Sequence, residues 1–322
     1  MPSHTNPFDP KWNSTLPFYQ IAEYNGLLVV TNRLGLSTTT GFKIENSQKI
    51  EISADEQIHV LSKGFYHGVG TPTTSGILSR LSSAGVGVWR TASNLLNCPW
   101  GFTVSDQGNY YFIDSIDNTS GGRVFLAGLS ASGTNFFLRF GLDNSSVPPP
   151  NSVSGPGTCT FDRDGTLLIV DGKDHQIKRF TTNGSWLGTY GTNGYDAGQF
   201  GVPMDVAADP AGSGFWVLEN RNRRIQHVSS NGLTIEKFGD ERPSFAEVLV
   251  DPLFFCFYSN QYAFVGDSGI KGVRFCALDG SNIGVWSAVT DPGFVMPVDI
   301  AVGPTGKVYF LYERSIKVFT KR

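Results

Sequence analysis

The chain of 322 residues contains no apolar run as long as a membrane span. Charged residues are scarce, at 16% of the chain, and the formal net charge is −3. A protein that binds nucleic acid or an anionic membrane through its overall charge needs a basic excess, which is missing here. The chain begins without a basic segment followed by an apolar core, so we expect no signal peptide.

Patterns typical of catalytic and metal centres are missing as well. The four cysteines are widely spaced and form no CxxC pair, which favours reduced, buried thiols. The sequence has no G-x-S-x-G nucleophile elbow, no P-loop and no dinucleotide fingerprint. None of the five histidines is paired with another at a metal-ligand spacing. We therefore expect no catalytic centre and no cofactor.

Turn-forming and aromatic residues are abundant instead. The chain has 38 glycines and 24 phenylalanines, and Asn, Ser and Thr are concentrated between the apolar runs. This composition is typical of many short strands joined by turns.

One pattern of four short strands recurs along the chain. After Pro203 the strands are "MDVAAD", "FWVLE", "RIQHVSS" and "LTIEKFG", which we call a, b, c and d. Hairpin signals join them, and Asn231-Gly232 between c and d is the strongest. The same order begins at other prolines and, in less regular form, near residue 48; these starts are Pro17, Pro99, Pro156, Pro252 and Pro297.

A four-stranded repeat of about 45–55 residues is the signature of a β-propeller, in which each repeat forms one blade. The sequence predicts an all-β fold, a single propeller over residues 1–322, with seven blades of four antiparallel strands. The blades start near residues 17, 48, 99, 156, 203, 252 and 297. Six blades are the alternative, if residues 17–98 form one long blade.

The two ends of the chain are expected to share a blade. The last repeat has three strands and no room for a fourth. The segment before Pro17 is predicted to supply the missing strand, so that pairing of the N- and C-terminal strands closes the ring without an open edge.

The glycine-rich stretch before Pro203, "GTNGYDAGQFGV", is predicted to carry the chain from strand d of one blade to strand a of the next. Such a tight crossing favours residues that tolerate positive φ. Phe200 is expected to pack between blades. Pro203 suits the first position of a strand, where the ladder needs no donor.

Three segments carry a family resemblance. "GYDAGQFGVPMDVAAD", "LLIVDGKDHQIKRF" and "WVLENRNRRIQHV" resemble NHL repeats. This resemblance implies a propeller with a binding role. It does not fix a ligand, because propellers carry many functions.

Candidate binding residues lie in the connections between strands b and c. Long b–c loops place Phe65, Tyr66 and His67 at one tip and Asn118 in another. Loops on a rigid scaffold often carry recognition, so we expect a protein or glycan partner there. A shorter b–c turn carries Arg221 and Arg223. Some NHL propellers bind RNA on this face, but the nearby acids and the net charge make nucleic acid an unfavourable partner.

Acidic residues also recur at fixed positions. One acid ends strand b in five repeats, and these acids form either an exposed acidic ring or caps for their own b–c turns; they are Asp114, Asp171, Glu219, Asp267 and Glu313. Asp205 and Asp299 lie near the start of strand a. No metal site is predicted, but if the chain bound a metal, these two carboxylates would be its ligands.

The sequence as a whole predicts a non-catalytic interaction module. Its low charge and polar loops favour a structural or surface component, with adhesive function, of a virion-like particle. A metal-dependent enzyme resembling propeller lactonases or lyases is the first alternative. A cytoplasmic NHL adaptor that binds protein or RNA is the second. The expected location is accordingly a virion or the cytoplasm.

Overall fold

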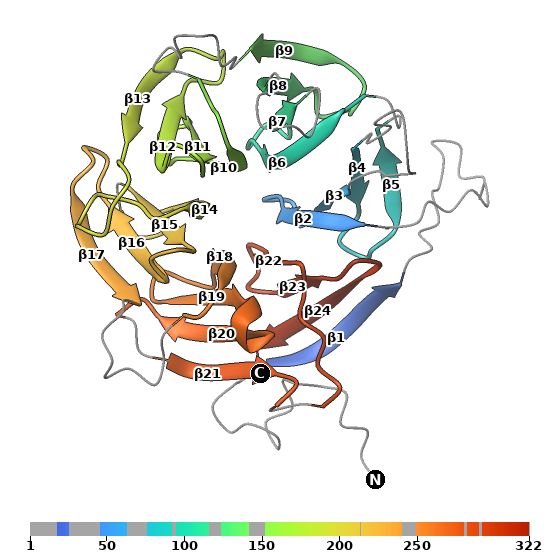
Figure 1. The fold of residues 1–322 in the computed structure, drawn as a ribbon. Coiled ribbons are helices and arrows are strands. Elements are labelled where there is room, and N and C mark those ends of the chain that lie inside the picture. Colours follow the sequence, from blue (N-terminus) through green and yellow to red (C-terminus); the bar gives the residue numbers. More distant parts are fainter. Residues whose placement is uncertain are drawn as a thin grey trace, which may run out of the picture. The chain divides into compact units, whose positions relative to one another are not determined.

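The computed structural model describes residues 18–25, 46–62, 76–91, 95–115, 124–141, 152–212, 214–239, 249–279, 282–289 and 292–321. These residues form six antiparallel sheets of four strands each, and Figure 1 labels their strands. The all-β prediction is confirmed. In the described part of the chain, no helix is long and apolar enough to cross a membrane.

The chain divides into two compact units, which we describe separately. The first comprises residues 1–118, 128–137 and 297–322, and the second comprises residues 119–127 and 138–296.

The first unit holds two complete sheets and most of another sheet, which is divided between the units. The first sheet contains β2 (Ser47–Ile52), β3 (Ile58–Ser62), β4 (Ile77–Leu81) and β5 (Gly87–Arg90). The next contains β6 (Cys98–Val104), β7 (Tyr110–Ser115), β8 (Val124–Leu129) and β9 (Phe136–Gly141), of which β8 and β9 are divided between the units. The other complete sheet has the strand order β1 (Phe18–Asn25), β24 (Ser315–Lys321), β23 (Val308–Leu311) and β22 (Asp299–Val302).

The second unit holds three sheets and the short 3-10 helix η1 (Ser268–Ile270). The first contains β10 (Pro156–Phe161), β11 (Leu167–Asp171), β12 (Gln176–Phe180) and β13 (Trp186–Tyr190). The second contains β14 (Pro203–Ala208), β15 (Phe215–Glu219), β16 (Arg224–Val228) and β17 (Thr234–Gly239). The third contains β18 (Pro252–Phe257), β19 (Tyr262–Asp267), β20 (Gly272–Ala277) and β21 (Asn282–Ser287).

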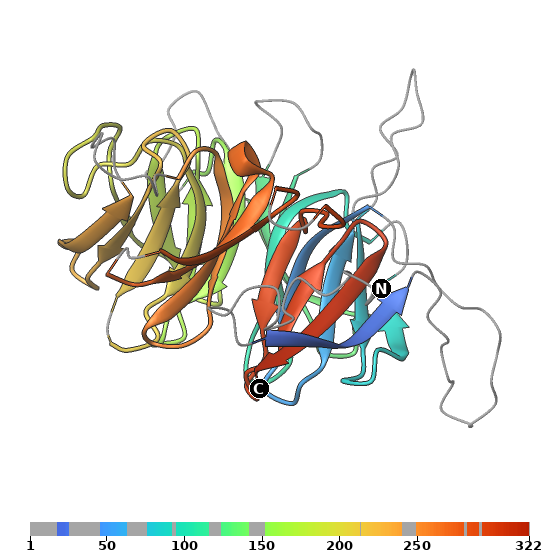
Figure 2. The ribbon, with the colours of Figure 1, turned by 90° about the horizontal axis from the view of Figure 1, so that it is seen from below.

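The prediction of seven blades is wrong, because the described residues form six sheets. The strand after Pro17 does not begin a blade of its own. It is β1, which pairs antiparallel with β24 from Phe18 opposite Lys321 to Asn25 opposite Ser315. Figure 2 shows β1 in blue alongside β24 in red. The predicted pairing of N- and C-terminal strands is thus confirmed, but residues 18–25 supply it rather than the segment before Pro17.

Most predicted blade starts coincide with the first strand of a sheet. Pro156, Pro203 and Pro252 each occupy the first position of their strand, as predicted. In each of these strands the register shifts directly after the first pair, so the proline is separated from the regular ladder by a bulge. A residue without an N–H donor is tolerated at such a position.

The cores are formed between neighbouring sheets of the same unit. In the first unit, β2, β3 and β4 pack their apolar residues against β22, β23 and β24; this cluster includes Ile50, Val60, Tyr309 and Val318. In the second unit, Phe200 is fully buried with Leu168, Val206 and Phe215. The predicted packing of Phe200 between blades is therefore confirmed.

Candidate functional site

The sequence-predicted binding residues differ in what the structure describes of them. Phe65, Tyr66, His67 and Asn118 lie outside the described residues. Arg221 and Arg223 lie in the turn between β15 and β16, and both are exposed. This turn stands beside the glycine-rich loop 191–202, which joins β13 to β14.

Loop 191–202 folds back on itself through its own backbone. The N–H of Phe200 donates to the carbonyl of Thr192 at 2.7 Å, and the N–H of Gly194 donates to the carbonyl of Phe200 at 3.3 Å. Gly191 has φ +88, and a Cβ at this position would lie 2.2 Å from the ring of Phe200. Glycine is required here because the backbone is left-handed and the ring occupies the space.

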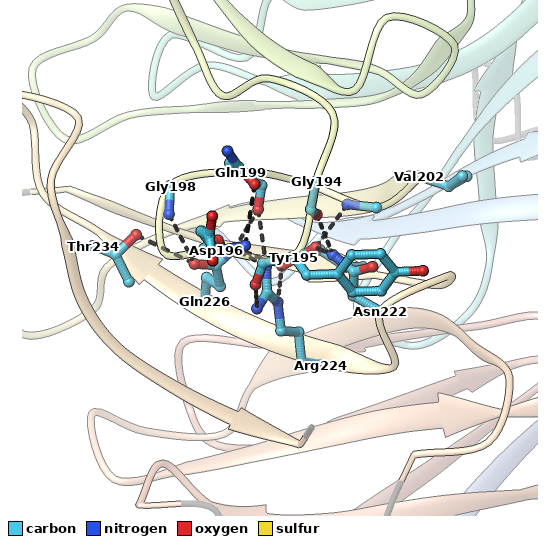
Figure 3. Close-up of polar contacts among 12 residues, drawn as sticks. Gly194, Tyr195, Asp196, Gly198, Gln199, Val202, Asn222, Arg224, Gln226 and Thr234 are labelled. Carbon is cyan, nitrogen blue, oxygen red and sulfur yellow. Dashed lines mark hydrogen bonds and ion pairs between the residues drawn. The ribbon is translucent and has the colours of Figure 1, made fainter. Parts of the chain in front are cut away.

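Arg224 binds the backbone of loop 191–202 from the protein interior. It is 1% exposed, and its guanidinium donates to the carbonyls of Tyr195 at 2.5 Å, Gln199 at 2.9 Å and Asp196 at 3.1 Å. Figure 3 shows the loop backbone arranged around this guanidinium. One buried guanidinium thus donates to three backbone carbonyls of the loop.

Glu219 balances the charge of Arg224. Its Oε1 accepts from Arg224 Nε at 2.7 Å and from Gln226 Nε2 at 2.6 Å. Its Oε2 accepts from the N–H of Gly201 at 2.7 Å and from Asn222 Nδ2 at 2.6 Å. A buried ion pair is stable only when its remaining hydrogen-bonding capacity is satisfied, and these four donors satisfy the carboxylate.

The side chains around this pair hold the loop as well. Asn222 Nδ2 donates to the carbonyl of Gly194 at 2.7 Å, and Gln226 Nε2 donates to the carbonyl of Gln199 at 2.8 Å. The N–H of Gly198 in turn donates to Gln226 Oε1 at 3.2 Å. The loop backbone is therefore fixed from Gly194 to Gly201 by buried side chains of β15, β16 and the turn between them.

This fixed loop presents an exposed tyrosine next to exposed arginines. Tyr195 is 57% exposed although its carbonyl is held by Arg224. The Arg221 guanidinium donates to Asn193 Oδ1, which places it beside the loop. We call loop 191–202 together with Arg221 and Arg223 the Tyr195 surface. Sequence reasoning missed Tyr195, although its position in a glycine-rich connection was a usable signal.

A histidine supports the far end of the loop. The N–H of Val202 donates to His175 Nδ1 at 3.0 Å, so this nitrogen acts as an acceptor. Burial and then the nearby Arg221 charge lower the pKa of His175. Both effects favour the neutral imidazole that the hydrogen bond requires.

The other acids at the end of strand b have the same capping role. Asp171 accepts from the N–H groups of Ser154 at 3.0 Å and Gly155 at 2.9 Å, just before strand a. Asp114 and Asp267 do the same in their sheets. The prediction that each acid caps its own b–c turn is confirmed only in part: each of these acids accepts one N–H from that turn and two from the segment that leads into strand a. Glu313 is exposed and lies beyond the ladder of β22 and β23.

Asp205 and Asp299 bind backbone amides of the neighbouring sheet. Asp205 Oδ2 accepts from the N–H of Phe255 at 3.0 Å, and Asp299 Oδ2 accepts from the N–H of Ile50 at 2.9 Å. Lys49 lies 3.8 Å from Asp299 Oδ2. Among the described residues, no group of three or more His, Cys, Asp or Glu side chains is arranged to hold a metal ion.

The chain matches known structures over most of its length but at low identity. A streptogramin B lyase structure has a TM-score of 0.58 at 16% identity and covers 95% of this chain and 98% of its own. Virginiamycin B lyase from Staphylococcus aureus, as a catalytically inactive variant with quinupristin, has a TM-score of 0.57 at 13% identity, covering 94% and 98%. A chain of a nidogen/laminin complex has a TM-score of 0.55 at 12% identity, covering 87% and 97%. These likenesses show the fold alone, which is a β-propeller.

Sequence relatives cover a smaller part of the chain. Peptidyl-glycine alpha-amidating monooxygenases A and B of Xenopus laevis are each 34% identical over 94 residues, or 28% of this chain. The chain spans about a tenth of the length of these curated relatives, at 10% and 11%. No family model matches, so the NHL resemblance is not confirmed.

Proposed function

We propose that the chain is a non-catalytic recognition module that binds a protein partner through the Tyr195 surface. The observation that carries this proposal is the buried clamp of Arg224 and Glu219 beneath an exposed tyrosine. A backbone that is already ordered loses little conformational entropy on binding, which strengthens association. Tyrosine and arginine are also the residue types enriched at the energetic centres of protein interfaces.

Comparison with the neighbouring sheets supports a role beyond packing. In each sheet of the second unit, a buried side chain on strand c donates to the acid that ends strand b. This donor lies seven residues after the acid, and in the three sheets it is Lys178, Gln226 and Arg274. Arg224 is an additional donor, and its equivalents by strand pairing are Gln176 and Gly272. In this sheet the cation thus stands at the start of strand c and the neutral Gln226 takes the later position, so the guanidinium reaches the loop that carries Tyr195.

The exposed charges of the surface indicate the chemistry of the partner. Arg221 and Arg223 are exposed together with one acid, Asp196, whereas Glu219 is buried. We infer that the partner supplies a carboxylate for Arg221 beside an apolar contact for the Tyr195 ring. Two exposed arginines are too few for tight binding to a phosphate backbone, which disfavours RNA.

The enzyme alternative receives less support. Both Asp205 and Asp299 accept backbone amides from a neighbouring sheet, which supports a structural role for these carboxylates. Some propellers of similar fold are lyases and one comes from a complex with a protein partner, so fold likeness favours neither class. The virion-surface role, a glycan partner at the long loops and the cellular location stay predictions.

The experiment is a quantitative comparison of captured proteins. Wild type, Tyr195→Ala, Arg221→Ala and Leu233→Ala are immobilised and exposed to extracts of the source organism. Leu233 is the matched control, because it is 66% exposed in the same unit but lies in the c–d turn at the opposite end of β16. We expect a partner that wild type and Leu233→Ala retain and that the other two variants lose about tenfold or more.

Two results would contradict the proposal. One is that every captured protein is retained equally by wild type and by Tyr195→Ala. The other is turnover of a lactone or lyase substrate that Asp205→Ala abolishes in a protein that stays folded, which would favour the enzyme alternative.

A further inference from the structure

The first unit contains a cavity of about 410 Å³ between the sheet β2–β5 and the strands β6 and β7. The turns after β2 and β6 form its rim, and β3, β4 and β7 contribute side chains to its wall. Pockets of about 300–1,000 Å³ are the usual size for small-molecule sites. Its polar side chains are Ser53, Asp55, His59, Arg80, Ser105, Asp106, Gln107 and Tyr110.

The polar wall arises from one row of residues across the sheet. Glu51, His59, Arg80 and Trp89 lie opposite one another on β2, β3, β4 and β5. Directly opposed residues share one face of a sheet. His59 and Trp89 both contact the ring of Tyr110 on β7, at centroid distances of 5.3 and 5.4 Å. The row therefore faces the neighbouring strands, and its two central residues, His59 and Arg80, line the cavity.

A chain of hydrogen bonds fixes the floor of the cavity. Tyr110 Oη lies 3.1 Å from His59 Nδ1, and His59 Nε2 lies 3.0 Å from Ser53 Oγ. Ser53 Oγ donates to Asp55 Oδ1 at 2.5 Å. His59 is 2% exposed, and burial lowers its pKa to about 3, so the imidazole is neutral. With the serine proton directed to Asp55, Nε2–H donates to Ser53 and Nδ1 accepts from the tyrosine.

This proton arrangement favours binding over nucleophilic catalysis. The Ser53 proton points to Asp55 and not to His59, and the hydroxyl of Ser53 is what chiefly lowers the pKa of Asp55. An imidazole with a pKa near 3 is a weak base at neutral pH. The chain therefore orients Ser53 and Asp55 rigidly and activates neither of them.

Hydrogen-bonding capacity remains open at the rim. Arg80 Nε is buried and has no partner among the described residues. Arg80 Nη2 lies 3.4 Å from Asp55 Oδ2, which leaves it weakly engaged, and the Asp55 side chain is 62% exposed. Asp106 and Gln107 are exposed on the opposite rim. Arg80 lines the cavity and its side chain is 26% exposed, so the guanidinium is a donor that a bound molecule can reach beside the acceptors of the rim.

We propose that this cavity binds a small polyhydroxylated molecule, such as a mono- or disaccharide. Each sugar hydroxyl can donate to Asp55 or Asp106 and accept from Arg80, which matches the mixed donors and acceptors of the rim. Two carboxylates against one guanidinium disfavour an anion, and the polar rim disfavours an apolar ligand. Because this site lies in the first unit, the proposal is independent of the Tyr195 surface.

The experiment is a binding titration of the full chain, labelled with 15N at its histidine rings and observed by NMR. The probes are the methyl glycosides of glucose, galactose, mannose and N-acetylglucosamine, with glycine and inorganic phosphate as zwitterionic and anionic comparisons. We expect at least one glycoside to saturate the protein and to shift the ring nitrogens of His59, because a bound hydroxyl perturbs Ser53.

Variants locate the site. Arg80→Met and Gln107→Ala are expected to weaken glycoside binding about tenfold or more, while Leu233→Ala leaves it unchanged. Gln107 is exposed in a turn, so its replacement is a safeguard in case Arg80→Met does not fold. The proposal is overturned if no glycoside binds, if only phosphate or glycine binds, or if folded Arg80→Met and Gln107→Ala bind as wild type does.

Discussion

Glu51 gives the folded protein a pH dependence that one substitution should remove. It lies on β2, and its Oε2 accepts from the N–H of Val104 at 2.9 Å. Burial raises the pKa of Glu51 from 4.5 to about 8, and the charge of Asp299 adds to this effect, while Lys49 opposes it. The neutral carboxyl group is therefore the form that the fold favours at neutral pH.

The sign follows from proton binding. Between pH 4.5 and 8 the folded state holds a proton on Glu51 that the unfolded state releases, so stability falls as pH rises. The contribution is fully present below pH 4.5 and is lost as pH approaches 8. At about 1.4 kcal/mol per pKa unit, the loss between pH 6.5 and 8 amounts to about 1.5 kcal/mol. This is an upper value, because part of Glu51 is accessible to solvent, and solvent reduces the cost of charging its carboxyl group.

The measurement is urea denaturation of wild type and Glu51→Gln at pH 6.5, 7, 7.5 and 8 at constant ionic strength. The pH range starts at 6.5 because His59 has the opposite effect below that pH. Its pKa is about 3 in the folded protein and 6.5 ordinarily, so it makes stability rise with pH between these two values. Glutamine keeps the acceptor for Val104 and cannot ionise. We expect the stability difference between the two proteins to grow by up to about 1.5 kcal/mol in favour of glutamine. Parallel curves would refute the reasoning.

Three further predictions concern stability. Arg224→Met leaves the Glu219 carboxylate buried without its cation, so the free energy of unfolding should fall by about 3–5 kcal/mol in urea denaturation. Gly191→Ala should destabilise the protein more than Gly165→Ala. Gly165 has a similar φ of +78, but no atom lies within 4 Å of a Cβ added there, so thermal denaturation should give a clearly lower midpoint for Gly191→Ala. Deletion of residues 1–25 removes β1 and uncovers the edge of β24, so we expect a lower thermal midpoint and aggregation in light scattering.

Local patterns in the sequence were sufficient for much of the fold. Asn183-Gly184 and Asn231-Gly232 stand in c–d turns where glycine has φ +88 and +86, and the strands on either side pair as expected. Such turns are specified by residues next to each other in the chain, so a sequence pattern contains the necessary information. The register of the inner strands follows from the same local signals.

The number of blades depended on a contact between the chain ends. The segment "FYQIAEYN" has the alternation of a strand and gives no indication of its partner. It pairs with β24, which begins at Ser315, almost the whole chain away. Strand propensity is local, whereas the choice of partner is decided by packing and hydrogen bonding in the assembled sheet. The sequence therefore predicted the strand but misplaced it by one blade.

The candidate sites show the same limit. Arg221 was predicted from a turn rich in arginine, but the clamp beneath Tyr195 joins residues almost 30 positions apart. His59 lies 51 positions from Tyr110, and its bond to Ser53 depends on a turn folding back over the strand. Neither arrangement has a characteristic spacing, because each is assembled from separate strands. A sequence motif search detects spacing and misses such contacts.

Departures from the repeat are the best guide to function in this chain. The acid that ends strand b is buried and capped in four sheets, so its recurrence reflects the closure of each sheet and not a shared activity. Where the cation stands at the start of strand c as Arg224, its buried ion pair with Glu219 also holds one exposed loop. Where Arg80 is only weakly engaged by Asp55, the sheet borders a cavity. Arg224 also stabilises the fold, and the proposed binding roles give both features a further physical reason.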